Sequence, residues 1–216
     1  MRQYDVVLFD LDGTLTDPGL GITSSVAHAL RRSGITPPPL HELYPFIGPP
    51  LIDAFMERYQ MTQEEAIAAV GYFREYFQRR GIFENKVYEG IGAMLGRLKA
   101  AGITVVLATS KPEEFALRIL EHFGLTGYFD CVTGATMDET LSRKGDIIAL
   151  ALTRCTPADH GRTVMVGDRK HDIQGAKENG LASIGVLYGY GSRAELEQAG
   201  ADQIAATVED LEALLL

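Results

Sequence analysis

The sequence predicts an α/β protein, with a parallel sheet that carries helices on both faces and is interrupted by an all-helical insertion. Short apolar runs recur along the chain, and each ends in polar residues or glycine, as buried parallel strands do. Between these runs, apolar residues recur at helical spacing. From about residue 17 to residue 84 the helical patterns continue without any strand-like run. Strand–helix alternation gives a covered parallel sheet, and the gap in that alternation predicts an inserted domain.

Five segments have the composition of strands. The first is Val6-Val7-Leu8-Phe9, which runs directly into Asp10-Leu11-Asp12-Gly13-Thr14. The other four predicted strands are residues 103–108, 128–132, 163–167 and 183–187. Apolar stripes predict core helices through residues 94–98, 115–123 and 147–152, then one through Ala176 that ends near Gly180, and a closing helix through Leu211 and Leu215.

The insertion starts at the turn signal Asp17-Pro18-Gly19. Thr62-Gln63-Glu64-Glu65 has the pattern of a capping box and predicts the start of a long helix. Phe73 and Phe77 lie on one face of that helix, and we expect them in the interior of the insertion. The expected division is an α/β core of residues 1–16 and 85–216, with a helical domain of residues 17–84.

Composition narrows the functional class. The chain has 216 residues and a net charge of −9, which argues against coating a nucleic-acid polymer because that needs clustered positive charge. No apolar run approaches the length of a membrane span, and no signal peptide precedes the first strand. The two cysteines, Cys131 and Cys155, are expected to be free thiols of a reducing compartment. We therefore expect a cytoplasmic enzyme, either a monomer or a homodimer.

Three of the predicted strands end in the same way. Residues 6–9 lead into Asp10, residues 103–108 into Thr109, and residues 163–167 into Asp168. Parallel strands bring such ends to one edge of the sheet, where ligands of open α/β sheets bind. Asp12 and Asp172 would join them, and clustered carboxylates repel one another unless a cation compensates. Hard oxygen ligands of this kind suit Mg²⁺, which would in turn dock a phosphoryl group.

These motifs resemble those of the haloacid dehalogenase-like hydrolase superfamily, most of whose members are phosphatases. Asp10 to Thr14 looks like the first motif, Thr109 the second, Lys144 the third, and the segment from Gly167 to Asp172 the fourth. The resemblance covers the whole chain and implies a Rossmann-like three-layer core with an inserted helical cap of the C1 type. Within the superfamily, the chain is similar to the 5′-nucleotidase-like branch and to phosphoglycolate phosphatases.

The resemblance also implies roles for individual residues. Asp10 would attack phosphorus and form an aspartyl-phosphate, while Asp12 would act as the general acid and base. Dehalogenases of the superfamily lack that second aspartate, so its presence favours phosphoryl transfer. The implied ligands of Mg²⁺ are the carboxylate of Asp10, the backbone carbonyl of Asp12, Asp168, and Asp172 in or near the coordination sphere. The implied phosphate-binding residues are Thr109, Ser110 and Lys144.

Some assignments have competitors. Lys111 and Lys170 compete with Lys144 as the phosphate-binding lysine, Thr109 could also cap the helix after Pro112, and Asp172 could cap its own helix. A noncatalytic metabolite-binding protein is the alternative from another class, but it would be expected to have lost Asp10 or Asp12.

The substrate also has alternatives. A sugar-phosphate mutase would need water to be denied access to the aspartyl-phosphate. The loop Gly48-Pro49-Pro50 has no Lys or Arg beside it, which favours a larger neutral leaving group over glycolate. The expected partner is a small phosphorylated metabolite.

Overall fold

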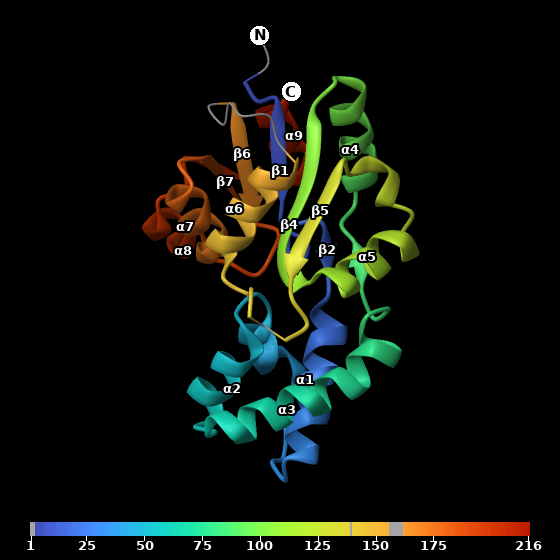
Figure 1. Ribbon diagram of the computed structural model, residues 1–216, viewed down its shortest axis with the longest axis vertical. Helices are drawn as coiled ribbons and strands as arrows, with labels where there is room; N and C mark the ends of the chain where they lie inside the picture. Colours follow the sequence, from blue (N-terminus) through green and yellow to red (C-terminus); the bar gives the residue numbers. More distant parts are fainter. Residues whose placement is uncertain (1–2, 139, 156–161) are drawn as a thin grey trace. The chain divides into compact units, whose positions relative to one another are not determined.

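The computed structural model describes residues 3–138, 140–155 and 162–216, and the chain divides into two compact units (Figure 1). The α/β unit comprises Met1–Asp17 and Val87–Leu216, and the helical unit comprises Pro18–Lys86. The sequence-based division ended the first segment of the α/β core at residue 16 and resumed the core at residue 85. The observed boundaries, at residues 17 and 87, differ from these by one and two positions.

The α/β unit is built on a six-stranded parallel sheet, which confirms the predicted fold class. Its strand order is β5-β4-β1-β6-β7-β8. The strands are β1 Val6–Phe9, β4 Thr104–Pro112, β5 Cys131–Ala135, β6 Thr163–Gly167, β7 Ala182–Val186 and β8 Gln203–Ala205. Val6 pairs with Thr104 on one side and with Thr163 on the other, so β1 lies centrally between β4 and β6. The carboxyl ends of these three strands are therefore neighbours.

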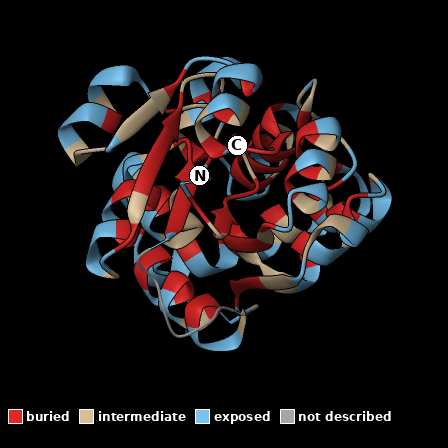
Figure 2. Ribbon diagram, turned by 90° about the horizontal axis from the view of Figure 1, so that it is seen from above, coloured by how far each residue is buried: buried red, intermediate tan, exposed pale blue. Residues whose placement is uncertain are grey.

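Helices cover both faces of the sheet. They are α4 Ile91–Ala100, α5 Glu113–His122, α6 Lys144–Cys155, α7 Lys170–Glu178, α8 Arg193–Ala199 and α9 Val208–Leu215. Val6 and Leu8 of β1 belong to one apolar cluster with Ile148 of α6 and Ala176 of α7. Side chains alternate between faces along a strand, so Val7 points away from that cluster. It is equally buried, and the sheet is therefore the middle layer of three, as the buried strands of Figure 2 show.

The structure departs from the predicted elements at several places, among them the unpredicted helix α8, the end of β4 at Pro112, the start of β5 and the strand β8. Strand β5 begins at Cys131 rather than at residue 128, because Thr126–Tyr128 forms a 3₁₀ turn (η3) and the Asp130 carboxylate accepts a hydrogen bond from the backbone N–H of Val105 at 2.8 Å. The sixth strand, β8, was not predicted. It has only three residues, too few for a periodic pattern to be recognised.

The expectation of free thiols was wrong. Cys131 at the start of β5 and Cys155 at the end of α6 form a disulfide, with their Cα atoms 5.8 Å apart. The two residues are 24 positions apart in sequence. They come together because α6 packs across β4 and β5, a proximity that spacing along the chain does not reveal.

The helical unit has its own aromatic and aliphatic core. Its elements are α1 Gly19–Arg32, the 3₁₀ helix η1 Leu40–Phe46, α2 Leu51–Tyr59, α3 Gln63–Tyr76 and the π-helical turn η2 Phe77–Gly81. Thr62 and Glu65 form the predicted capping box at the start of α3. Phe73 and Phe77 are buried and stacked with their ring centroids 5.3 Å apart, which confirms that they belong to the interior of this unit.

A short two-stranded sheet pairs β2 (Thr16–Asp17) with β3 (Lys86–Val87), at the two points where the chain passes between the units. The backbone N–H of Tyr88 donates to the carbonyl of Leu15 at 3.1 Å, so the outgoing and returning segments are bonded to each other. Within the described residues, none of the helices combines the length and the apolar character that crossing a bilayer requires.

Candidate active site

The central strands place polar residues at one edge of the sheet. Asp10 follows β1 directly, Thr109 lies near the carboxyl end of β4, and Asp168 follows β6. The register of β1 with β4 and with β6 makes these three positions neighbours although they are far apart in sequence. Asp172 is in the first turn of α7, and Lys144 is the first residue of α6.

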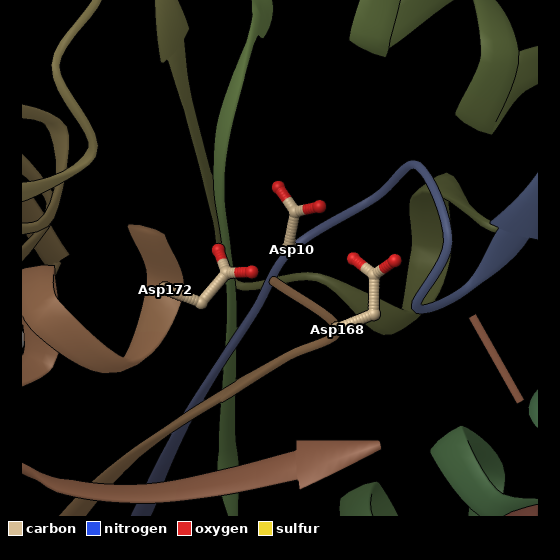
Figure 3. Close-up of side chains that lie close together, drawn as sticks. All are labelled: Asp10, Asp168 and Asp172. Carbon is tan, nitrogen blue, oxygen red and sulfur yellow. The ribbon is translucent and has the colours of Figure 1, made fainter. Parts of the chain in front are cut away.

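Three carboxylates converge at this edge (Figure 3). Asp10, Asp168 and Asp172 each offer an oxygen, and these oxygens lie within 4.8 Å of one another. The three residues are almost inaccessible, with exposed fractions of 7%, 0% and 2%. Burying three acidic groups together is costly unless positive charge compensates.

Lys144 supplies part of that compensation. Its Nζ lies 2.5 Å from Oδ1 of Asp10 and 2.9 Å from Oδ1 of Asp172, and it donates to the carbonyl of Ala108 at 3.0 Å. Burial alone would lower the pKa of Lys144, but the carboxylates of Asp10 and Asp172 outweigh burial and raise it. Lys144 is therefore a permanent cation that bridges two of the three carboxylates.

Asp168 is enclosed by backbone. Gly13 has a φ of +87°, and a Cβ at Gly13 or at Gly189 would overlap the Asp168 side chain. The backbone N–H of Tyr190 donates to Oδ2 of Asp168 at 2.7 Å. Only glycine allows the loop after β1 and the loop after β7 to approach this carboxyl so closely. One oxygen of Asp168 is thereby held by backbone.

The remaining carboxylate oxygen of Asp168 fits the role of a cation ligand. Oδ1 of Asp168 is buried and has no hydrogen-bond partner among the described residues. Burial raises the pKa of Asp168 well above its ordinary value, and the charges of Asp172 and Asp10 raise it further. Burial also raises the pKa of Asp172, against the opposing effect of Lys144. Buried hard oxygen donors with excess negative charge fit a divalent cation such as Mg²⁺.

Asp12 is not part of this carboxylate group. Its Oδ2 accepts an ion-paired hydrogen bond from Nζ of Lys111 at 2.5 Å, and both side chains are largely buried. Burial raises the pKa of Asp12, and the nearby ammonium of Lys111 opposes that effect. The resemblance assigned the backbone carbonyl of Asp12, not its carboxylate, to the metal, and that assignment stays a prediction.

The competing lysines are separated by their surroundings. Lys144 contacts Asp10 and Lys111 contacts Asp12, whereas Lys170 is exposed at the start of α7. Thr109 is buried, and its hydroxyl accepts a hydrogen bond from the backbone N–H of Lys111 at 3.2 Å. The N-cap position of α5 is Pro112, so Thr109 does not cap that helix.

Two remaining site assignments have clear positions. Ser110 is half-buried beside Thr109. Asp172 caps its own helix, since its Oδ2 accepts from the backbone N–H of Arg169 at 3.0 Å while Oδ1 faces Lys144. The capping alternative and the position beside the other two carboxylates therefore coexist.

Sequence reasoning gave no role to the contacts of Lys111 and Tyr190. A signal existed for each. Lys111 follows Thr109 by two positions, the spacing that puts two strand residues on the same face. Tyr190 belongs to the glycine-containing stretch Tyr188-Gly189-Tyr190-Gly191, which follows the strand β7 at the ligand-binding edge.

A parallel α/β sheet that gathers buried aspartates and a lysine at the carboxyl ends of its central strands defines an α/β enzyme of the phosphoryl-transfer type. The chain belongs to the haloacid dehalogenase-like hydrolase family, whose model matches residues 7–186. This confirms the resemblance that the motifs indicated and makes the protein a phosphoric monoester hydrolase of that family.

Relatives with several names support this placement. A 5′-nucleotidase of Pseudomonas aeruginosa is 46% identical over 90% of this chain and 87% of its own length. Tyrosine-protein kinase PtkA of Mycobacterium tuberculosis is 38% identical over 95% of this chain and 70% of its own length. A phosphoglycolate phosphatase of Agrobacterium fabrum is 31% identical over 86% of this chain and 81% of its own length. The crystal structure of a predicted phosphatase from Clostridium acetobutylicum superposes with a TM-score of 0.93 at 47% identity, covering 97% of each chain.

Proposed function

We propose that this enzyme is a Mg²⁺-dependent phosphatase that hydrolyses a small phosphate monoester through an aspartyl-phosphate on Asp10. The observation that carries the proposal is the contact of Lys144 with Asp10 beside the unpartnered oxygen of Asp168. This arrangement puts one carboxylate next to a fixed cation and leaves an acidic position for a second cation. Both are needed to bring a phosphate dianion against a carboxylate nucleophile.

In the first step, a carboxylate oxygen of Asp10 forms a bond to phosphorus while the bond from phosphorus to the ester oxygen breaks. The electron pair of the breaking bond stays on the ester oxygen, and Asp12 donates its proton there, so that an alcohol leaves. Lys144 and Thr109, with Ser110 beside it, bind the phosphoryl oxygens and stabilise the charge that they carry during transfer.

In the second step, water attacks the phosphorus of the aspartyl-phosphate. Asp12, now ionised, accepts a proton from that water, and the phosphorus–oxygen bond to Asp10 breaks, which releases inorganic phosphate. Asp10 and Asp12 are thereby restored. General acid–base work of this kind contributes about 10²–10⁴-fold to a rate.

The residues that would hold Mg²⁺ are Asp10, Asp168, Asp172 and the backbone carbonyl of Asp12. When bound, the ion would offset the negative charge of the carboxylates and of the phosphoryl group. We further propose that the helical unit, residues 18–86, has the role of the cap that the resemblance implies.

For the substrate, we propose a 5′-nucleotidase-like preference for a nucleoside monophosphate. Two observations support it. The Pseudomonas aeruginosa relative of that name is 46% identical, and the stretch from Ser33 to Glu57, which contains Gly48-Pro49-Pro50, has no Lys or Arg to hold a glycolate carboxylate. The alternative substrate is phosphoglycolate.

The activity is tested with p-nitrophenyl phosphate. Hydrolysis should require Mg²⁺, stop on chelation with EDTA, and disappear in Asp10→Asn. Full activity in that variant, or turnover without any divalent ion, would refute the mechanism. A screen of nucleoside monophosphates against phosphoglycolate decides the substrate. A preference for phosphoglycolate would overturn the proposed branch and leave the chemistry intact.

The kinase-named relative supports a second candidate, in which the aspartyl-phosphate passes to an acceptor hydroxyl instead of water. The phosphoryl group would move from Asp10 to the acceptor oxygen, whose proton would go to Asp12. Measuring inorganic phosphate and released alcohol together, with and without a tyrosine derivative, distinguishes the two. Hydrolysis predicts equal amounts of both products, and transfer predicts a phosphate deficit matched by a phosphorylated acceptor.

A further inference from the structure

The ion pair between Lys111 and Asp12 is the strongest feature that the proposed mechanism does not use. Lys111 belongs to β4 and Asp12 to the loop after β1, and their side chains are only 6% and 12% exposed. A buried pair of this kind loses much of its hydration, which surface pairs retain. The burial of this pair therefore suggests a specific role for Lys111, which an exposed ion pair would not.

The backbone around Lys111 is built to aim its side chain. The pairing of β4 with β5 is irregular between Thr109 and Pro112, and such bulges redirect side chains next to active sites. The backbone N–H of Lys111 donates to the Thr109 hydroxyl, and its carbonyl oxygen would lie 2.7 Å from a Cβ at Gly134. The N–H of Lys111 is therefore hydrogen-bonded, and its carbonyl packs closely against the backbone of β5 at Gly134.

The two oxygens of Asp12 have different surroundings. Oδ2 accepts from Lys111, whereas Oδ1 is buried with no hydrogen-bond partner in the part of the chain that the structure describes. The backbone of Asp12 is also restrained, because it forms a bridge with Thr16, and the N–H of the next residue, Gly13, donates to the carbonyl of Thr16 at 2.7 Å. Oδ2 of Asp12 is therefore anchored, and Oδ1 has no protein partner among the described residues.

We propose that Lys111 is a positioning residue that anchors Oδ2 of Asp12 and thereby presents Oδ1 to the ester oxygen of the leaving group. The inference rests on the proposed function, in which Asp12 protonates that oxygen. Lys111 does not touch the reacting phosphoryl group. Its effect reaches the reaction only through the orientation of the Asp12 carboxyl, and a carboxyl that can rotate donates its proton less often in the correct geometry.

This role makes a prediction about leaving groups. An alkoxide leaving group needs a proton as it departs, whereas p-nitrophenolate is a stable anion and leaves without one. Loss of the anchor should therefore impair alkyl phosphates much more than p-nitrophenyl phosphate. A residue that binds the phosphoryl group would impair both substrates equally, because both carry the same group.

The experiment compares kcat/KM, which reports the steps up to aspartyl-phosphate formation, for p-nitrophenyl phosphate and for adenosine 5′-monophosphate. The variants are Lys111→Met, Lys111→Gln, Lys111→Arg, Asp12→Asn and the double variant Lys111→Met with Asp12→Asn. The exposed residue Lys177 provides the matched control, Lys177→Met. Lys111→Gln keeps a hydrogen-bond donor for Asp12 and serves if Lys111→Met does not fold. Thermal unfolding verifies that each variant is folded, and calorimetry verifies that it still binds Mg²⁺.

We expect Lys111→Met to lower kcat/KM for the alkyl ester by about 10²-fold, within the range of general acid catalysis, and for the aryl ester by less than about tenfold. Lys111→Gln should shift the ratio of the two kcat/KM values in the same direction, and Lys111→Arg should restore this ratio to that of the unmodified enzyme. In the Asp12→Asn background the Lys111→Met change should add almost nothing, since residues that act as one unit are not additive.

Equal losses on both substrates, or additive losses in the double variant, would overturn the proposal. So would a rise in KM with unchanged kcat, which would make Lys111 a substrate ligand. These failures differ from failure of the proposed function, in which the unmodified enzyme itself would hydrolyse neither ester. If the unmodified enzyme prefers phosphoglycolate, only the substrate branch fails, and phosphoglycolate replaces adenosine 5′-monophosphate as the alkyl ester.

Discussion

Nζ of Lys144 lies 2.5 Å from Oδ1 of Asp10, although 133 residues stand between them in the chain. The contact exists because Lys144 opens α6, which packs on the sheet beside the end of β1. In the proposed mechanism, this contact lets the Asp10 carboxylate approach a phosphate dianion, because the ammonium of Lys144 offsets part of the repulsion.

Lys144→Met should reduce kcat/KM for p-nitrophenyl phosphate by about 10²–10³-fold, the loss typical of removing one oxyanion-stabilising donor. It should also destabilise the metal-free protein by about 3 kcal/mol, since Asp10 and Asp172 are then buried without their counter-charge. Steady-state kinetics and urea denaturation measure the two effects. Retention of activity within tenfold would show that another residue neutralises the phosphoryl group.

Mg²⁺ should stabilise the protein, because binding at the carboxylates relieves their repulsion. At 100 times its dissociation constant, the ion should add about 2.7 kcal/mol to the free energy of unfolding, and EDTA should remove that increment. Asp168→Asn should abolish the increment. Asp146→Asn, at an exposed position in the first turn of α6, is the matched control and should retain it. An increment that survives in Asp168→Asn would place the ion elsewhere.

Gly189→Ala should weaken Mg²⁺ binding, because the added methyl group would collide with the Asp168 side chain and with the backbone of Gly13. Gly92→Ala is the matched control. Nothing lies within 4 Å of a Cβ at Gly92, which is in α4, so alanine there should raise stability by about 0.5–1 kcal/mol. Calorimetric titration with Mg²⁺ measures both variants. Unchanged affinity in Gly189→Ala would show that the loop after β7 does not position Asp168.

Asp130→Asn should cost about 1 kcal/mol at pH 7, the size of a hydrogen bond in a partly exposed ion pair. Asp130 accepts from Lys99 at 2.5 Å and from the backbone N–H of Val105. Although burial opposes it, these donors lower the pKa of Asp130 in the folded protein.

The sign of the pH dependence follows from that direction. A lowered folded-state pKa gives stability above the unfolded-state pKa, at about pH 4, and this stability disappears as the pH falls through the folded-state pKa. The difference in unfolding free energy between Asp130→Asn and the unmodified protein should therefore shrink below about pH 4. Urea denaturation at pH 7 and at steps toward acid pH measures it, and a difference that is independent of pH would contradict the assignment.

Much of the α/β core could be predicted from local pattern. Residues 6–9 are apolar because β1 is buried on both faces, and Gly102, Gly124 and Gly180 follow helices as expected of C-terminal signals. Elements such as β8 could not be predicted, because three residues carry no period. The disulfide between Cys131 and Cys155 was missed for a different reason, since it depends on how α6 crosses β5.

The sequence by itself determined the fold class, the family and which acidic residues belong to the site, because strand patterning and the Asp-x-Asp motif are local properties of the chain. Only the tertiary structure decided which lysine meets which aspartate. The resemblance favours Lys144 over Lys111 as the phosphate-binding lysine, but it names no aspartate partner for either. In the structure, Lys144 at the start of α6 contacts Asp10, and Lys111 in the irregular part of β4 contacts Asp12. Charge partners of buried groups are chosen by long-range packing, which a local pattern cannot encode.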